Sequence, residues 1–294
     1  MLDYSQLEAL AAVAKTGSFD QAAAELSVTP SAISQRIKAL EERAGAVLIV
    51  RGQPCQPTQI GARLIRHFDD VMVLEHTLAG DIGPISDKSF TTLKIAVNAD
   101  SLATWFLPPL SRMTGFLFDL VIDDQDHSAD LLRCGQVIAA ITSRAEPVQG
   151  CNSHPLGALR YSATATPDFM LKWLPHGATP DALKHAPTIT FSPKDRLQVD
   201  WIRKTANTQI TPPTHMMAGS NAFVEAACLG LGWCMNPDVL IQDHLKRGTL
   251  RRLNDTPLDT PLYWQVSRHV LQALAPLTKE ILKEARDKLV QSAG

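Results

Sequence analysis

No stretch of the 294-residue sequence approaches the roughly 20 uninterrupted apolar residues that a helix needs to cross a bilayer. The N-terminal segment carries Asp3 and has no basic region ahead of its apolar residues, so it lacks the form of a signal peptide. We therefore expect a cytoplasmic protein. Apolar residues make up 45% and charged residues 20%, which predicts a soluble globular chain, and the length suits two domains.

Cysteine is scarce, and the five that occur are odd in number and scattered, with no C-x-x-C pair. This pattern argues against a disulfide framework and against a zinc site. Buried apolar thiols are the favoured interpretation, and a redox pair formed by Cys228 and Cys234 is the alternative. The five are Cys55, Cys134, Cys151, Cys228 and Cys234.

Catalytic signatures are also lacking. The sequence contains no H-E-x-x-H, G-x-S-x-G or P-loop motif, and its nine histidines never pair at metal-ligand spacing. His127 and His154 are interpreted as single, solvated loop residues. The sequence thus predicts no catalytic residue, no metal and no cofactor, and an α/β enzyme is the competing hypothesis from another class.

The net charge of −2 hides an uneven distribution of basic residues. Between Ser31 and Arg66 there are six basic residues and only two acids, which gives this segment a charge of +4. A local basic footprint of this kind is what contact with nucleic-acid phosphates requires.

The first residues predict two helices with defined ends. Apolar residues at helical spacing indicate a helix over 4–15, which Gly17 ends. Ser18 can cap a second, short helix over 18–26. The turn that follows, over 26–28, lacks the glycine often found between such helices.

A third helix is predicted over 30–43, with Thr29 as its cap and Pro30 at its first position, where a missing N–H costs nothing. Its inward face carries the apolar residues Ile33, Ile37, Leu40 and Ala44. The opposite face is polar near the helix start, as expected of a recognition helix in the DNA major groove. An ordinary amphipathic helix with a solvated face is the alternative. The predicted DNA-binding residues are Thr29, Pro30, Ser31, Ser34, Gln35, Arg36, Lys38 and Arg51.

The β-branched run over 47–51 and the glycine and prolines after it predict a strand, a turn and a return strand. Such a wing would hold Arg51 near the DNA backbone or minor groove. A long helix over 59–80 comes next, and its apolar stripe has nothing in its own chain to bury against. We therefore expect a second copy of the chain to pack on it, so that the dimer binds paired half-sites in double-stranded DNA. The stripe is Ile60, Leu64, Phe68, Val71, Leu74 and Leu78.

The segment SFDQAAAELSVTPSAISQRIKALEERAGAVLIVR, followed by PTQIGARLI, resembles the N-terminal domain of LysR-type transcriptional regulators. Few unrelated proteins combine A-A-x-x-L, x-P-S-A-[IV]-S-x-x-I-x-x-L-E and x-T-x-x-G at these spacings. The resemblance implies a homodimer or homotetramer and allows RNA polymerase as a further partner. It implies a helix-turn-helix at 18–37 in a DNA-binding domain over 1–58, a dimerising linker helix over 59–80, a hinge over 81–92 and an effector-binding domain over 93–294.

The last two hundred residues alternate strands and helices, which predicts a parallel sheet covered by helices. The first lobe has strands over 93–97, 116–122 and 137–141 and helices over 101–111 and 128–134. A second lobe has strands near 160–165, 187–191, 214–217 and 231–235 and helices near 195–206 and 221–229. A strand over 262–267 and a helix over 275–290 return the chain to the first lobe. The fold class is α+β overall, and the family resemblance implies two lobes that close around a small ligand, as in periplasmic binding proteins.

Polar residues at strand ends predict the ligand site. Asn98, Asp100 and Ser101 open a helix, where free N–H groups can hold a carboxylate and Asp100 an ammonium, although simple helix capping is the alternative. Asp123 and Asp124 end the next strand and either hold a cation or lie solvated in a loop. The remaining candidates are Thr142 and, less strongly, Ser143 at another strand end, Ser220 at a helix start of the second lobe, and Asn236 after the strand over 231–235.

The segments NADSLATWFLP, SNAFVEAA and GWCMNP, with the I-D-D strand end, resemble the ArgP branch of the family, which senses lysine and arginine and controls basic amino-acid export. The resemblance implies an effector site built from Asn98, Asp100, Ser101 and the Asp123-Asp124 pair. A LysR-type regulator that senses an organic or aromatic acid is the alternative. The paired acids argue against it, because they would repel an anionic ligand.

Overall fold

A computed structural model describes residues 2–82, 90–123 and 128–291. The chain forms two compact units, one of Met1–Leu93 with Gly115–Leu117 and the other of Lys94–Thr114 with Phe118–Gly294.

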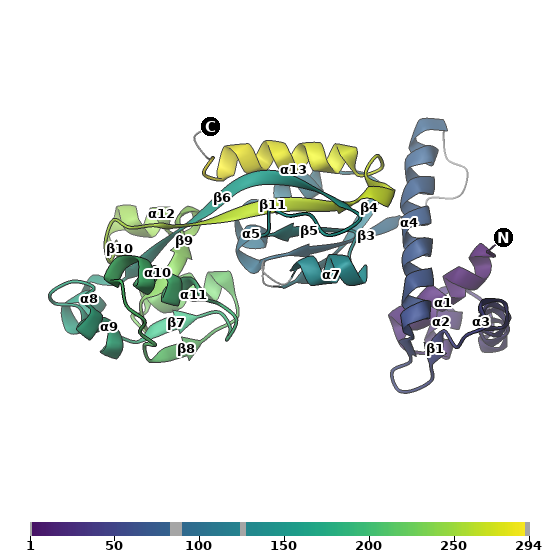
Figure 1. The fold of residues 1–294 in the computed structure, drawn as a ribbon, viewed down its shortest axis with the longest axis horizontal. Coiled ribbons are helices and arrows are strands. Elements are labelled where there is room, and N and C mark those ends of the chain that lie inside the picture. Colours follow the sequence, from purple (N-terminus) through teal and green to yellow (C-terminus); the bar gives the residue numbers. More distant parts are fainter. Residues whose placement is uncertain (1, 83–89, 124–127, 292–294) are drawn as a thin grey trace. The chain divides into compact units, whose positions relative to one another are not determined.

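In the first unit, three helices pack around one end of a long helix (Figure 1). The predicted inward face of the third helix is confirmed, since Ile33, Ile37 and Leu40 are at most 2% exposed. Ala44, which we expected on that face, is exposed because it is the last residue of the helix. The elements are α1 (Tyr4–Thr16), α2 (Phe19–Glu25), α3 (Pro30–Ala44), β1 (Ile49–Val50), β2 (Gln56–Pro57) and α4 (Gln59–Ile82).

Side-chain caps fix the N-terminal ends of α2 and α3, as predicted. Ser18 Oγ accepts a hydrogen bond from the N–H of Gln21 at 3.5 Å, and Thr29 Oγ1 accepts one from Ala32 at 3.2 Å. Between the two helices Ser27 has φ +54°, the left-handed conformation that glycine usually supplies. The turn therefore has its usual geometry without the glycine.

The predicted wing is present but shorter than expected, with two residues in each strand and Val50 opposite Gln56. The N–H of Cys55 donates to the Gly17 carbonyl at 2.8 Å, which ties the wing to the turn after α1. Gly17 has φ +70°, and a Cβ there would lie 2.7 Å from Cβ of Pro54. The close approach of the wing thus requires glycine.

The T-x-x-G motif starts α4. Thr58 Oγ1 donates to the Val47 carbonyl at 2.8 Å and accepts from the N–H of Gly61 at 3.1 Å. A Cβ on Gly61 would collide with the Leu48 carbonyl oxygen, so the motif lets the helix start pack directly on the chain that enters the wing.

The side chains of the apolar stripe on α4 are not all exposed to solvent. Leu64 and Phe68, which we expected against a second chain, are partly buried against the core of their own unit. Ile60, Leu74 and Leu78 are exposed to 47%, 44% and 49% and remain available to a partner.

In the second unit a mixed sheet has the strand order β10 (Arg251–Arg252), β6 (Cys151–Ala165), β11 (Leu258–Ser267), β5, β3 and β4, with β9 (Cys234–Pro237) beside β6. The predicted parallel pairing holds for β3 and β5, whereas β11 is antiparallel to both β5 and β6. The first-lobe elements are β3 (Thr91–Val97), α5 (Ala99–Thr104), α6 (Leu107–Ser111), β4 (Phe116–Ile122), α7 (Ser128–Cys134), β5 (Ala139–Thr142) and α13 (Ala275–Lys288).

The single helix predicted over 101–111 is wrong, because α5 and α6 are separate. Pro108 and Pro109 have no N–H to donate to the turn before them, so the helix cannot run through. Trp105 and Phe106 in the break are at most 1% exposed and anchor it in the core.

Two long strands, β6 (Cys151–Ala165) and β11 (Leu258–Ser267), pass through both lobes (Figure 1). Only 160–165 and 262–267 were predicted as strand. Within β6, Pro155 and Gly157 are residues that normally interrupt a strand. Gly157 has φ +110°, close to the Val290 carbonyl, and the pairing register shifts between Leu262 and Tyr263. His154 lies within β6 and is half-buried, so its interpretation as a solvated loop residue is wrong.

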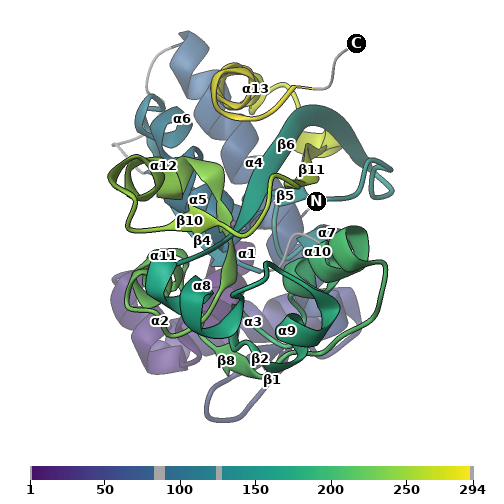
Figure 2. The same ribbon diagram turned by 90° about the vertical axis from the view of Figure 1, so that its left-hand side faces the viewer.

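The second lobe, seen end-on in Figure 2, groups short helices around the parallel pair β7 and β8. Helices α8, α9 and α12 were not predicted, and β9 lies about three residues later than expected. The elements are α8 (Pro167–Trp173), α9 (Pro180–His185), β7 (Thr188–Thr190), α10 (Leu197–Ala206), β8 (Thr214–Met216), α11 (Ser220–Cys228), β9 (Cys234–Pro237), α12 (Asp238–Arg247), β10 (Arg251–Arg252) and the 3-10 turn η1 (Arg268–Val270).

Candidate functional site

The polar face of α3 is turned away from the core of the first unit. Ser31, Gln35 and Lys38 are exposed, and Ser34 and Arg36 are half-buried. Lys38 Nζ lies 3.8 Å from Glu42, with both side chains about 70% or more exposed. An ion pair so exposed contributes little. Lys38 can therefore exchange this partner for a phosphate.

Arg51 of the wing is exposed and stacks on α2. Its guanidinium carbon lies 5.2 Å from the centre of the Phe19 ring, within cation–π range. Thr29 and Pro30 at the start of α3 are exposed as well. The predicted DNA-binding residues thus belong to the exposed surface of one unit, apart from the half-buried Ser34 and Arg36.

In the first lobe, three predicted ligand residues gather at the carboxyl ends of adjoining strands. Ala96 of β3 lies opposite Ala140 of β5, so Asn98 and Thr142 end the two strands side by side. The N–H of Asp123 donates to the Val97 carbonyl at 3.3 Å, which places Asp123 at the same edge. Asp124 and His127 lie outside the described residues.

Two buried polar residues at this edge, and one in β9 of the second lobe, have oxygen atoms without partners among the residues that the structure describes. Asn98, Ser101 and Asn236 are 5%, 0% and 0% exposed, and Asn98 makes no cap bond to α5. Their atoms Asn98 Oδ1, Ser101 Oγ and Asn236 Oδ1 have no hydrogen-bond partner within the described part of the chain. Such atoms cost about 1–3 kcal/mol each unless a ligand or water satisfies them. Helix capping, the alternative for Asn98, is not what its side chain does.

Asp100 joins the lobes. Its Oδ1 accepts a hydrogen bond from Ser220 of the second lobe at 2.6 Å, and its Oδ2 accepts one from Tyr161 of β6 at 2.8 Å. The carboxylate therefore stands between α5, β6 and α11, where it can hold a cationic group.

A small cavity lies beside Asp100 between the lobes. Its volume is about 20 Å³, which is room for a single water molecule, so a ligand as large as an amino acid requires the lobes to move. Its lining residues are Asp100, Phe191, Asp195, Leu197, Ser220, Phe223, Met235, Asn236 and Pro237.

Tyr161 and Asp195 were missed by sequence reasoning. Asp195 accepts hydrogen bonds from the N–H groups of Phe191 at 3.1 Å and Leu197 at 3.0 Å, so its place just before α10 was the available signal. Asn236 was expected after a strand but lies inside β9, where its Nδ2 donates to Thr164 Oγ1 at 3.0 Å.

The thiols differ in their surroundings. Burial is the main cause that raises the pKa of Cys234, to about 12, and burial also raises the pKa of Cys228. Cys228 Sγ lies 3.3 Å from His244 Nδ1. The expectation of buried thiols holds for Cys55, Cys151 and Cys234 but is wrong for Cys134, which is exposed.

Within residues 2–82, 90–123 and 128–291, no group of three or more His, Cys, Asp or Glu side chains could hold a metal ion. In those same ranges, no helix is both long and apolar enough to cross a membrane.

Comparison with known proteins gives matches over nearly the whole chain. The family model of bacterial regulatory helix-turn-helix proteins of the lysR family matches residues 4–62, and that of the LysR substrate binding domain matches 86–290. The HTH-type transcriptional regulator LysG of Mycobacterium tuberculosis is 45% identical over 264 residues, which cover 90% of this chain and 87% of that protein.

Solved structures agree with the sequence matches. The crystal structure of ArgP from Mycobacterium tuberculosis superposes with a TM-score of 0.85 at 41% identity, covering 99% of this chain and 100% of that one. Full-length LysG from Corynebacterium glutamicum with bound effector Arg has a TM-score of 0.72 at 34% identity, covering 98% and 100%. The fold and sites define a DNA-binding transcriptional regulator with a small-molecule domain. The chain belongs to the LysR family.

Proposed function

We propose that this regulator senses L-lysine or L-arginine between the two lobes of its second unit and controls basic amino-acid export or metabolism. The observation that carries the proposal is the set of three buried oxygen atoms without partners, on Asn98, Ser101 and Asn236, around the interlobe carboxylate of Asp100. The arginine-bound LysG structure supports the same ligand class.

Each end of an amino acid has a chemically matched group. Ser101 Oγ can donate to the α-carboxylate, with Asn98 beside it, and Asp100 can accept from the α-ammonium. Asp123 or Asp124 would pair with the side-chain cation. Thr142 and Ser220 complete the walls of the site on the two lobes. Burying a charged ligand requires such partners, because an unpaired charge in a dry site is strongly unfavourable.

The output of the regulator is the binding of its α3 helix to DNA. Ser34 and Gln35 would read base edges, while Arg36, Lys38 and Arg51 would bind phosphates. A second copy would pack on the exposed residues Ile60, Leu74 and Leu78 of α4, so that the dimer engages paired half-sites.

A thermal-shift screen tests the ligand class with the full chain. The twenty proteinogenic amino acids are compared with keto acids and aromatic acids as controls. We expect lysine and arginine to give the largest rise in melting temperature, because a ligand that binds only the folded state stabilises it. A larger rise with aromatic or keto acids would contradict the proposal.

Two variants separate the proposed roles by calorimetry. Asp123→Asn should weaken lysine and arginine far more than neutral amino acids, because it removes a partner of the side-chain cation. Ser101→Ala should weaken all amino acids alike, because every one has the α-carboxylate. If Asp123→Asn lowered the affinity for all amino acids equally, Asp123 would not be the partner of the side-chain cation.

A further inference from the structure

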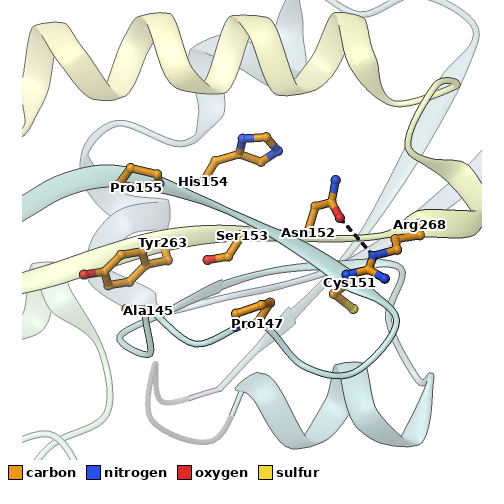
Figure 3. Close-up of a pocket in the computed structure, with 9 residues that line it drawn as sticks. All are labelled: Ala145, Pro147, Cys151, Asn152, Ser153, His154, Pro155, Tyr263 and Arg268. Carbon is orange, nitrogen blue, oxygen red and sulfur yellow. Dashed lines mark hydrogen bonds between the residues drawn. The ribbon is translucent and has the colours of Figure 1, made fainter.

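Two adjoining hollows lie along the first part of β6, one between β6 and α13 and the other lined by β6, Tyr263, Arg268 and the chain just before β6. Each has a volume of about 380 Å³, and they share Asn152 and His154. Neither shares a lining residue with the cavity beside Asp100. Figure 3 shows the first hollow, in which His154 and Ser153 extend to opposite sides of β6. We name the two hollows together the α13 groove and define it by Asn152, Tyr263, Arg268, Lys279, Leu282 and Arg286.

The charged residues lining the α13 groove are all basic. Arg268, Lys279 and Arg286 line it, and no Asp or Glu does. Arg268 Nε donates to Asn152 Oδ1 at 3.0 Å, but none of the three basic residues forms an ion pair with any residue that the structure describes. An anion that enters the groove could therefore pair with these cations without breaking an existing ion pair.

Two of the three acids of α13 are held away from the groove, and the third, Asp287, does not line it. Glu280 and Glu284 bind Arg112 of the first lobe at 3.1 Å and 2.8 Å, and these contacts raise the pKa of the arginine. Two carboxylates of α13 are thus paired to Arg112, whereas two of its cations, Lys279 and Arg286, line the groove.

The floor of the groove is apolar. Leu271, Ala275 and Leu282 line the part beneath α13, and Pro147 and Tyr263 line the part beyond β6. His154, which lines both hollows, and Ser153, which lines the first, carry the buried atoms Nε2 and Oγ, and neither atom has a hydrogen-bond partner among residues 2–82, 90–123 and 128–291. A ligand that suits these surroundings has an apolar body and an anionic end.

We propose that the α13 groove is a second small-molecule site and binds an organic carboxylate with an apolar body. The anionic end lies among Arg268, Lys279 and Arg286, and the apolar body lies on Leu271 and Leu282. This site is separate from the amino-acid site between the lobes and does not depend on it.

Hexanoate is the probe, titrated against the full chain by ligand-observed NMR. A ligand of this size should bind saturably with a dissociation constant on the order of millimolar. Butyrate should bind about 16-fold more weakly, since each buried methylene contributes about fourfold in affinity. Hexylamine, which has the same apolar body with the opposite charge, should not bind.

Lys279→Gln is the variant that tests the site, because no hydrogen bond of the described structure uses its side chain. It should weaken hexanoate about two- to fivefold, the range expected of one exposed ion pair, and Arg268→Gln with Lys279→Gln should weaken it further. Lys283→Gln is the matched control, since Lys283 is exposed on the same helix but does not line the groove.

Three results would overturn the proposal: no saturable hexanoate binding, an equal loss in Lys283→Gln and Lys279→Gln, or one-for-one displacement of hexanoate by L-arginine. The last result would mean that hexanoate binds at the site between the lobes. Failure of L-arginine to bind at all would contradict the proposed amino-acid function but would not affect the proposal for the α13 groove.

Discussion

Replacing Asp100 with asparagine removes a negative charge that is hydrogen-bonded to Ser220 of the second lobe and to Tyr161 of β6. The carboxylate accepts hydrogen bonds from the hydroxyl groups of Tyr161 at 2.8 Å and Ser220 at 2.6 Å, and it lines the interlobe cavity. If it also holds the α-ammonium of the effector, the asparagine variant leaves that ammonium without a charged partner.

The expected loss follows from the burial of the site. Truncating one partner of a desolvated charge pair typically costs about 2–5 kcal/mol, which is about 30- to 4,000-fold in affinity. Asp100 is only half-buried, so we expect the lower end, about 30- to 100-fold weaker arginine binding. Calorimetry with L-arginine measures this directly.

Ser220→Ala, at a wall of the same site, is the variant for comparison. It removes one hydrogen bond between the lobes and keeps the carboxylate, so arginine affinity should stay within about fivefold of the unmodified protein. If Asp100→Asn binds arginine as well as Ser220→Ala does, the carboxylate does not hold the ligand and its assigned role is wrong.

The other predictions concern DNA, assembly and pH. Gln35→Ala should weaken the free energy of DNA binding by about 1–3 kcal/mol and relax the base preference at one position in footprinting. Lys38→Ala should weaken binding to all DNA sequences alike and lower the slope of log affinity against log salt concentration by about 1. An unchanged site preference in Gln35→Ala would mean that α3 does not read the bases. Leu78 is 49% exposed and available to a second copy, so Leu78→Asp should place a charge in the dimer interface and give monomers in sedimentation. Leu64 packs on its own core, so Leu64→Asp should instead lower the melting temperature of the first unit. An unchanged oligomer in Leu78→Asp would mean that the interface does not include this part of α4. The pKa of Asp259 is lowered mainly by two hydrogen bonds from Arg160, both 2.7 Å, so its stabilisation is present above the unfolded pKa of about 4 and is lost as pH falls through the lower folded pKa. Asp259→Asn should lower the free energy of unfolding by up to about 1 kcal/mol at pH 7 and by nothing below that folded pKa, and an equal effect at both pH values would rule out the ion pair as the cause.

Local signals made the first unit predictable. Thr29-Pro30 specifies the start of α3, because the threonine caps the helix and the proline needs no N–H there. Thr166-Pro167 and Thr179-Pro180 carry the same signal, and both start helices, α8 and α9, that our sequence interpretation missed. These two errors lay in the interpretation and not in the sequence.

Other features depend on contacts that no local pattern contains. The strand β6 continues through Pro155 and Gly157 because β11 pairs along its length. Leu64 belongs to the same apolar stripe as Leu78, yet it packs on the core of its own unit because its end of α4 lies against the buried cluster formed by residues of α1, α2 and α3. Asp100 could be proposed as a ligand residue from its strand-to-helix position. Its contacts with Tyr161 and Ser220, 61 and 120 residues away, appear only in the folded chain.

The most direct test of the proposed function compares L-lysine with L-norleucine, which has the same four side-chain carbons without the distal ammonium. Both have the α-carboxylate and α-ammonium, so Ser101 and Asp100 would treat them alike, and only the acids at the end of β4 would distinguish them. Calorimetry on the full chain should show lysine bound about 30-fold or more tightly, the loss expected when a desolvated cation partner is absent. Equal affinity for lysine and norleucine would mean that no acid reads the side chain, and the assignment as a sensor of basic amino acids would fail.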